Sequence, residues 1–241
     1  MNNPFDELTK GLAQSVTHRA ALKQCGVGLA GMALALMLGL PSEATDPKVQ
    51  TSTVLDPAGD AEFPTDLFGG PVPPYLDMVK ASVIYSRDIF QFEVQVNAPI
   101  PNDPSPDFTT IVNHLGPVFG ILTNRKTSVP GFSFFGQNDS YRFNFLVGAV
   151  YSFADSGVGL PLGWTGLLID FNTFTVVAIP MKIQGDTLSF EISAASIGNP
   201  SSLQWVVASE CHPVPVPEEK RKSMIMADFA PDHDYASWPA Q

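Results

Sequence analysis

The chain has 241 residues, a length that fits one large β domain or two small ones. Charged residues make up only 15% of it, and 19 glycines and 22 prolines supply many turns. A typical soluble domain has roughly 25% charged residues. A long helical bundle needs many charged surface positions, so this composition favours sheets over helices.

The formal net charge is −11, and all of it lies on residues 45–241 because acids and bases balance in residues 1–44. A surface of this sign repels phosphate backbones, which argues against nucleic-acid binding. Cationic ligands or Ca²⁺ fit it better. The same charge also serves solubility.

An export signal is predicted over residues 1–44. Arg19 and Lys23 precede an uncharged apolar run at 25–40, Pro41 ends that run, and Ser42 and Ala44 are small residues before a predicted cut. The run is shorter than the roughly 20 residues of a membrane-spanning helix. We therefore expect no stable transmembrane segment after signal removal. Retention of the segment as a signal anchor is the alternative.

The start of the signal resembles a twin-arginine signal, whose pattern is Ser/Thr-Arg-Arg-x-Φ-Leu-Lys (Φ apolar). His18 stands where the first arginine is expected, so the general secretory and twin-arginine routes both stay open. Residues 45–241 are expected in the periplasm, the cell envelope or the extracellular space. The positions that match are Thr17, Arg19, Ala21, Leu22 and Lys23.

The two cysteines cannot form a disulfide in the mature chain. Cys25 lies in the predicted signal, which leaves Cys211 alone in residues 45–241. A disulfide-stapled scaffold is thereby excluded, and an apolar core must hold the fold.

Short strands with turn residues between them are predicted along the mature chain. The clearest is 88–99, where Phe90, Phe92, Val94 and Val96 alternate with polar residues. A hairpin turn at 86–88 joins it to the run before it, and 99–107 is a proline-rich loop. The other strands are predicted at 49–55, 75–85, 117–122, 141–153, 164–170, 174–179, 188–192 and 203–207.

This pattern predicts an all-β fold, an antiparallel β-sandwich of the jelly-roll or immunoglobulin-like kind. We expect one such domain over residues 45–241, with irregular N- and C-terminal ends. Trp164 and Trp205 fall in strands and are expected in its core.

Four blocks of residues occur in a recognisable order in this domain. In that order they resemble secreted bacterial β-sandwich modules, the family-9 carbohydrate-binding and DOMON-like domains. The blocks are Asp56-Pro57-Ala58-Gly59-Asp60 with Leu76-Asp77-Met78-Val79 and Ala98-Pro99-Ile100-Pro101; Leu122-Thr123-Asn124-Arg125 with Gly131 and Ser140-Tyr141; Val176 to Ile179 with Gly185-Asp186, Phe190-Glu191-Ile192 and Ile197-Gly198; and Asp228-Phe229-Ala230-Pro231-Asp232.

The resemblance implies a β-sandwich that binds a carbohydrate without catalysis. Acidic residues after strand ends often hold Ca²⁺ in these modules. Here Asn124 and Ser140 stand where acids are frequent, so the resemblance does not carry a calcium site to these two positions.

The loop at 130–141 is the predicted ligand-binding surface. Aromatic rings can stack on sugars, and amide and acid groups can fix hydroxyls, although phenylalanine lacks a polar handle. Core packing of the rings is the alternative interpretation. The predicted ligand-binding residues are Phe132, Phe134, Phe135, Asn138 and Tyr141.

Three acids near the C-terminus, Asp228, Asp232 and Asp234, are a candidate Ca²⁺ site. They lack the glycine and glutamate of an EF-hand loop, so solvated surface acids are the alternative. No other cofactor is expected.

Three classes of function remain open from the residues. We expect an exported, non-catalytic module whose partner is a glycan or an envelope component. A secreted glycoside hydrolase or lyase is the first alternative, with Glu93, Asp170 and Glu191 as strand-borne acids. A structural envelope protein without a small ligand is the second.

Overall fold

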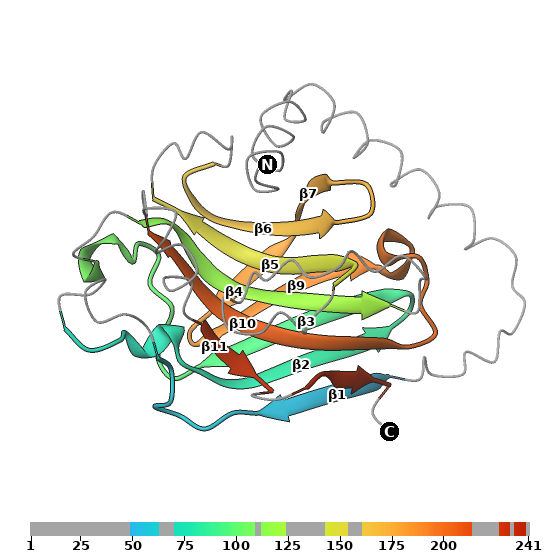
Figure 1. Ribbon diagram of the computed structural model, residues 1–241, viewed down its shortest axis with the longest axis horizontal. Coiled ribbons are helices and arrows are strands. Elements are labelled where there is room, and N and C mark those ends of the chain that lie inside the picture. The colour runs from blue at the N-terminus through green and yellow to red at the C-terminus, as the bar shows by residue number, and fades with distance from the viewer. Residues whose placement is uncertain are drawn as a thin grey trace, which may run out of the picture.

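The computed structural model describes residues 49–62, 70–108, 112–123, 143–153, 161–213, 227–231 and 234–239. These residues form two antiparallel sheets packed face to face (Figure 1), which confirms the predicted β-sandwich. The predicted export signal at 1–44 lies outside the described residues. In the described part of the chain, no helix has the length and apolar character to cross a membrane.

The first sheet has five strands, and its order is not the chain order. The hairpin of its second and third strands lies in the middle, and the edges come from the first strand and from a later hairpin. From edge to edge the strands are β1 (Gln50–Leu55), β2 (Met78–Ser86), β3 (Ile89–Val96), β9 (Thr187–Ser193) and β8 (Met181–Gln184).

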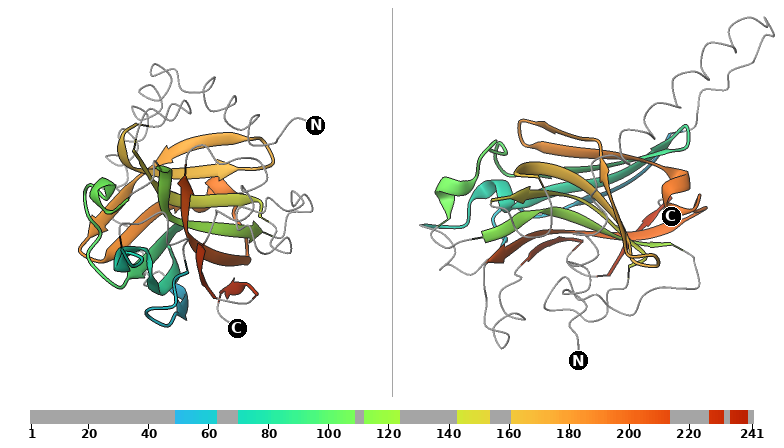
Figure 2. Two further views of the ribbon diagram at one scale, coloured as in Figure 1. Left: turned by 60° about the vertical axis from the view of Figure 1, so that its left-hand side comes forward. Right: turned by 90° about the horizontal axis from the view of Figure 1, so that it is seen from above.

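The second sheet has seven strands and covers the first, as the two views of Figure 2 show. From edge to edge its path is β11 (Ala227–Ala230), β10 (Leu203–Pro213), β4 (Val112–Thr123), β5 (Phe145–Ser152), β6 (Gly163–Asp170) and β7 (Thr175–Ile179); β12 (Ala236–Trp238) pairs with β10 beside this path. Three 3₁₀ turns complete the described elements: η2 (Pro74–Leu76), η3 (Ser105–Asp107) and η4 (Ala194–Ile197).

The β2–β3 hairpin forms where the sequence predicts it. Arg87 and Asp88 both have positive φ, 52° and 61°. Two such residues are what a type I′ turn needs, and its twist matches that of the flanking strands. The Tyr85 hydroxyl donates to Asp88 Oδ1 at 2.8 Å and braces the turn.

The core lies between the sheets and is rich in aromatic rings. Phe90, Phe92 and Val94 on β3 are fully buried, as their alternation predicts. From the facing sheet, the Phe119 ring lies 5.1 Å from the Phe92 ring and 5.7 Å from the Trp205 ring, centroid to centroid. Edge-on and tilted arrangements at such distances stabilise aromatic clusters.

Two indole N–H groups tie the seven-stranded sheet to β1. Trp205 Nε1 donates to Ser52 Oγ at 3.1 Å, and Trp238 Nε1 donates to the Gln50 carbonyl at 3.3 Å. Trp205 is fully buried, which confirms its predicted place in the core. Trp164 is half-buried and packs against the core.

The predicted loop at 99–107 is held down by three aromatic side chains that donate hydrogen bonds to it. Each ring lies in or against the core and places its polar group at the surface of the sandwich. The bonds run from Tyr75 Oη to Asp107 Oδ2 (2.8 Å), from Tyr151 Oη to Asp103 Oδ1 (2.9 Å) and from Trp164 Nε1 to the Pro101 carbonyl (3.0 Å).

Several strand boundaries differ from the predicted ones. Tyr75 and Leu76 lie in η2, so the strand predicted from 75 begins only at Met78. The strands β4 and β10 are longer than predicted, and β5 starts at Phe145 instead of 141. The short strands β8, β11 and β12 were not predicted at all.

A charge on the buried face of β3 should prevent folding. We expect Phe90→Asp to lose the cooperative unfolding transition, because an unpaired buried carboxylate costs several kcal/mol against a total stability of roughly 5–15 kcal/mol. Gln91→Asp is the matched control, since this neighbour faces the other way and is half-buried. Thermal unfolding followed by circular dichroism measures both. Equal stability of the two variants would contradict the assignment of faces.

Cys211 is fully buried in the core and free. Burial, and after it the charge of Glu210, raises the pKa of this thiol to about 12. The thiolate is the reactive form, so Cys211 should stay unreactive well above the usual thiol pKa of roughly 8.5.

We expect the folded, signal-free protein to release no chromophore from a disulfide reagent such as DTNB at pH 8. In guanidinium chloride it should release one equivalent. Fast labelling of the folded protein would show that Cys211 is accessible.

Candidate functional site

The predicted ligand-binding loop lies outside the described residues. Phe132, Phe134, Phe135, Asn138 and Tyr141 all fall between residues 124 and 142. Their role in binding stays a prediction. Within the described residues, two other features of the molecule have the composition of a site.

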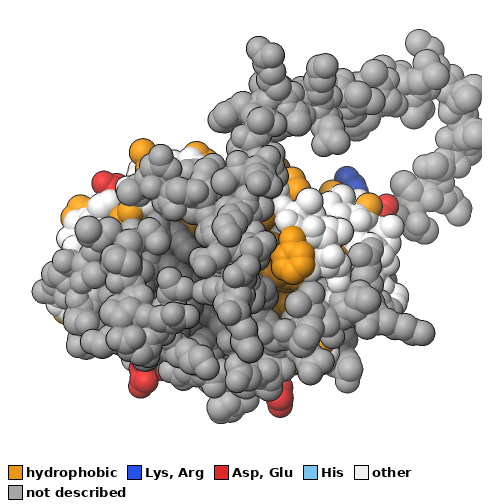
Figure 3. All heavy atoms as spheres, turned by 45° about the horizontal axis from the view of Figure 1, so that its top comes forward, with side chains coloured by type: hydrophobic (Ala, Val, Ile, Leu, Met, Phe, Trp, Pro, Cys, Tyr) orange, Lys and Arg blue, Asp and Glu red, His pale blue; other side chains and the backbone are white. Residues whose placement is uncertain are grey.

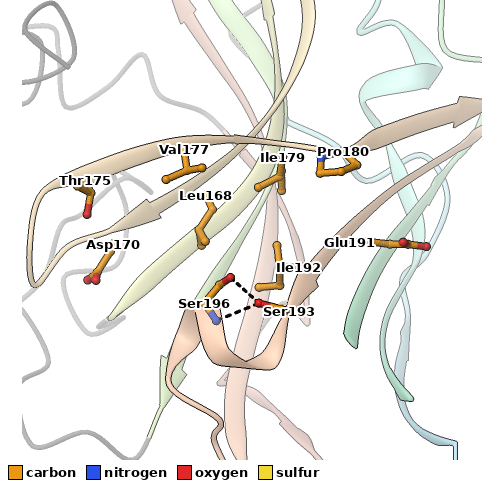
Figure 4. A pocket seen from close by; sticks show the side chains of 10 residues that line it. All are labelled: Leu168, Asp170, Thr175, Val177, Ile179, Pro180, Glu191, Ile192, Ser193 and Ser196. Atoms are coloured by element: carbon orange, nitrogen blue, oxygen red, sulfur yellow. Dashed lines mark hydrogen bonds between the residues drawn. The ribbon is translucent and has the colours of Figure 1, made fainter. Parts of the chain in front are cut away.

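The first feature is a groove where the chain crosses from one sheet to the other. β7 is the last strand of the seven-stranded sheet, and after Pro180 the chain enters β8, the last strand of the five-stranded sheet. Beside this crossing, the β6–β7 hairpin faces β9 and η4 across the open side of the sandwich (Figure 4).

The groove has a volume of about 390 Å³, within the range of small-ligand pockets. Its floor is aliphatic: Leu168 and Ile192 are buried, while Val177 on the wall is 53% exposed. Its rim carries carboxylates and hydroxyls. The lining residues are Leu168, Asp170, Thr175, Val177, Ile179, Pro180, Glu191, Ile192, Ser193 and Ser196.

Hydrogen bonds orient several polar groups of the rim. Ser193 caps η4: its Oγ accepts from the Ser196 amide at 3.3 Å and shares a hydrogen bond with Ser196 Oγ at 2.8 Å (Figure 4). Asp170 Oδ1 accepts from the backbone and side-chain nitrogens of Asn172, at 2.8 and 2.9 Å, and so fixes the β6–β7 turn. Thr175 Oγ1 hydrogen-bonds to its neighbour Thr173. Each hydroxyl keeps lone pairs for a ligand, and each carboxylate accepts only.

Two of the three strand-borne acids considered for catalysis lie on this groove. Asp170 ends β6 and Glu191 lies on β9, whereas Glu93 lies on β3 between Ser82 and Ser189 of the neighbouring strands. Figure 4 shows Asp170 and Glu191 on opposite walls, with Glu191 pointing away from Asp170. The carboxylates of Asp170 and Glu191 are thus separate hydrogen-bond acceptors, and they do not face each other as a catalytic pair would.

The surface beside the groove is apolar. Phe174 and Val177 on the β6–β7 hairpin are each 53% exposed. Where Figure 3 shows described residues, apolar side chains lie at the surface together with scattered charged ones.

The second feature is an acidic cluster made from distant parts of the sequence. Asp56 and Asp60 lie in the loop after β1, and Asp228 lies on β11. Carboxylate oxygens of these three residues all lie within 4.8 Å of one another.

Asp77 adjoins this cluster just before β2 and is only 4% exposed. Its Oδ2 accepts from the Gly59 amide, inside the loop of Asp56 and Asp60, and from Asn97 Nδ2, both at 2.8 Å. Its other oxygen, Oδ1, is buried without a hydrogen-bond partner among the described residues.

Asp228 joins the two sheets through its carboxylate. Its Oδ2 accepts from the Met78 amide on β2 at 2.6 Å, although β11 belongs to the other sheet. Burial raises the pKa of Asp228 to about 7, and the charges of Asp60 and Asp77 raise it further, against the lowering effects of the Met78 amide and of a hydrogen bond with Asp56. Its neighbouring charges are therefore negative ones.

The cluster differs from the grouping that the sequence suggested. Asp232 lies outside the described residues, and Asp234 is exposed and not among the three acids whose oxygens come together. The sequence analysis quoted Asp56, Asp60 and Asp77 in the blocks that carry the family resemblance but did not consider them as ligands. Those blocks were the feature of the sequence that could have pointed to these three acids.

No protein-family model matches the chain, and no curated protein matches it.

Proposed function

We propose that this protein is an exported, non-catalytic β-sandwich module that binds a carbohydrate in the groove between the β6–β7 hairpin and β9. The observation that carries the proposal is the composition of that groove, which has an aliphatic floor and a rim of oriented oxygen atoms.

A sugar ring has the complementary chemistry. Its C–H faces can pack on Leu168, Val177 and Ile192. Its hydroxyls can donate to the carboxylate of Asp170 and to the hydroxyl oxygens of the rim. The same acceptors disfavour phosphorylated or carboxylated ligands, because like charges repel. A neutral glycan therefore suits the groove best.

The position of the two acids supports binding over hydrolysis. A glycosidase needs its two carboxyl groups roughly 5–9.5 Å apart on either side of the scissile bond. Asp170 is engaged in its own turn, and Glu191 points away from it (Figure 4). This arrangement does not support the alternative of a hydrolase or a lyase.

Binding to a glycan array, followed by calorimetric titration of the best ligand, tests the proposal. We expect Val177→Arg to weaken binding at least about 10-fold, or ~1.4 kcal/mol, because the long charged side chain would fill the groove. Leu55→Arg is the matched control: it also replaces an exposed apolar residue, at the far edge of the five-stranded sheet. It should bind like the wild type.

Three results would contradict the proposal. Failure of the folded protein to bind any glycan would remove carbohydrate binding. Equal loss of binding in both arginine variants would remove the groove. Release of reducing sugar from a bound glycan would replace a binding module with an enzyme.

Export is tested separately, by mass spectrometry of the secreted protein. The sequence at 17–44 predicts an N-terminus at or near Thr45. An intact Met1 in the exported fraction would contradict cleavage of the signal.

A further inference from the structure

We propose that His114, His212 and Glu210 bind a zinc ion on the outer face of the seven-stranded sheet, the face turned away from the core between the sheets. The ion would lie beside Ser152. These residues come from three neighbouring strands, β10, β4 and β5 (Figure 1). The proposal is independent of carbohydrate binding in the groove.

The register of these strands places two histidines directly opposite each other. His212 on β10 is the partner of His114 on β4, and His114 is in turn the partner of Ser152 on β5. Directly opposed residues of antiparallel strands have Cβ atoms roughly 4.5–5.5 Å apart. At that separation both imidazoles of a cross-strand pair can reach one ion, at Zn–N distances of roughly 2.0–2.1 Å.

The alternation of the strands places Glu210 on the same face as the two histidines. Cys211 on β10 and its register partner Leu115 on β4 both belong to the core between the sheets. Successive residues of a strand alternate between its two faces. His114, His212 and Glu210 are the chain neighbours of these core residues and therefore lie on the outer face.

Glu210 lies two residues along β10 from the histidine pair, a distance of roughly 6.6–6.8 Å. Its register partner on β4 is Gly116, so no side chain of β4 stands opposite it. A Cβ on Gly116 would lie 2.1 Å from the Ala149 carbonyl oxygen, and its φ is 150°, so this position requires glycine. Glu210 is thus close enough to the pair to supply a carboxylate ligand.

Ser152 supplies an independent reason to expect a polar ligand in this row. It is only 1% exposed, and its Oγ is buried without a hydrogen-bond partner among the described residues. A buried hydroxyl without a partner costs free energy, so it needs an explanation. A water molecule bound to an ion at the neighbouring histidines would give this hydroxyl its partner.

The donor set selects a metal of the zinc type. Imidazole nitrogen suits zinc and its neighbours in the transition series, whereas Ca²⁺ and Mg²⁺ prefer oxygen ligands throughout. Zinc held by two histidines and one glutamate is four-coordinate with a water in the fourth position. Glu210 is 2% exposed, so the positive ion would also lie beside a buried carboxylate. The hydroxyl of Ser152 would then hydrogen-bond to the water.

Calorimetric titration of the EDTA-treated full-length protein with ZnCl₂ tests this proposal, together with thermal unfolding. An ion shared by β4 and β10 stabilises the folded state, so we expect a rise in Tm of roughly 5–10 °C at about 100 times Kd. His114→Ala and His212→Ala should each weaken binding at least about 10-fold and lose most of that rise. Glu210→Gln keeps the size of the side chain and should weaken binding in the same direction.

His233→Ala is the matched control, because it also removes an imidazole but lies in neither β4 nor β10. It should bind Zn²⁺ like the wild type. The effect of EDTA and of added ZnCl₂ on the wild-type Tm tests the site without any substitution.

Four results would overturn the proposal. The first is the absence of both Zn²⁺ binding and a Tm shift in the wild type. The second is equal loss of binding in all three histidine variants, and the third is unchanged binding in His114→Ala, His212→Ala or Glu210→Gln. The fourth is an equal effect of MgCl₂, which would show that oxygen ligands elsewhere hold the ion.

Discussion

Burial of one apolar face of each sheet against the other is the constraint on which the rest of the structure depends. Phe92 and Phe119 meet across the interface, and Trp205 packs beside Phe119. An indole buried there must still satisfy its N–H group, because a buried donor without a partner costs roughly 1–3 kcal/mol. Trp205 donates to Ser52, on the edge strand of the opposite sheet. Packing and hydrogen bonding therefore fix the same relative position of the sheets.

The sequence predicts a strand well only where one face of the strand is buried and the other is exposed to solvent. β3 and β9 alternate, and their predicted ranges lie close to the observed ones. β5 is buried at all of its positions, so its sequence carries no period of two to mark its end. β4 likewise reads as a short apolar run, and its true length is fixed by pairing with β10 along nearly the whole strand. Such partners cannot be read from a local pattern.

The candidate sites were harder to predict than the fold for the same reason. Asp228 was recognised as a candidate ligand, but a local reading joined it to its sequence neighbours Asp232 and Asp234. The observed cluster instead needs β11 to pair with β10 and to lie against β2 of the other sheet. The groove also depends on contacts between distant parts of the chain. Asp170 and Glu191 were both noted as acids on strands, but their strands meet at one groove because the chain crosses from β7 to β8.

The two sites lie at opposite open sides of the sandwich. β1 and β11 are the edge strands on one side, and β8 and β7 are the edge strands on the other. On the first side, Trp238 of β12 packs on Phe90 and donates to Gln50 at the start of β1. The acidic cluster lies beyond the other end of β1, after Leu55. Among the residues that the structure describes, the chain crosses the second side at Pro180, and the groove lies beside that crossing. The acidic cluster and the groove therefore lie at different edges of the sandwich, and the order of the strands in the two sheets keeps them apart.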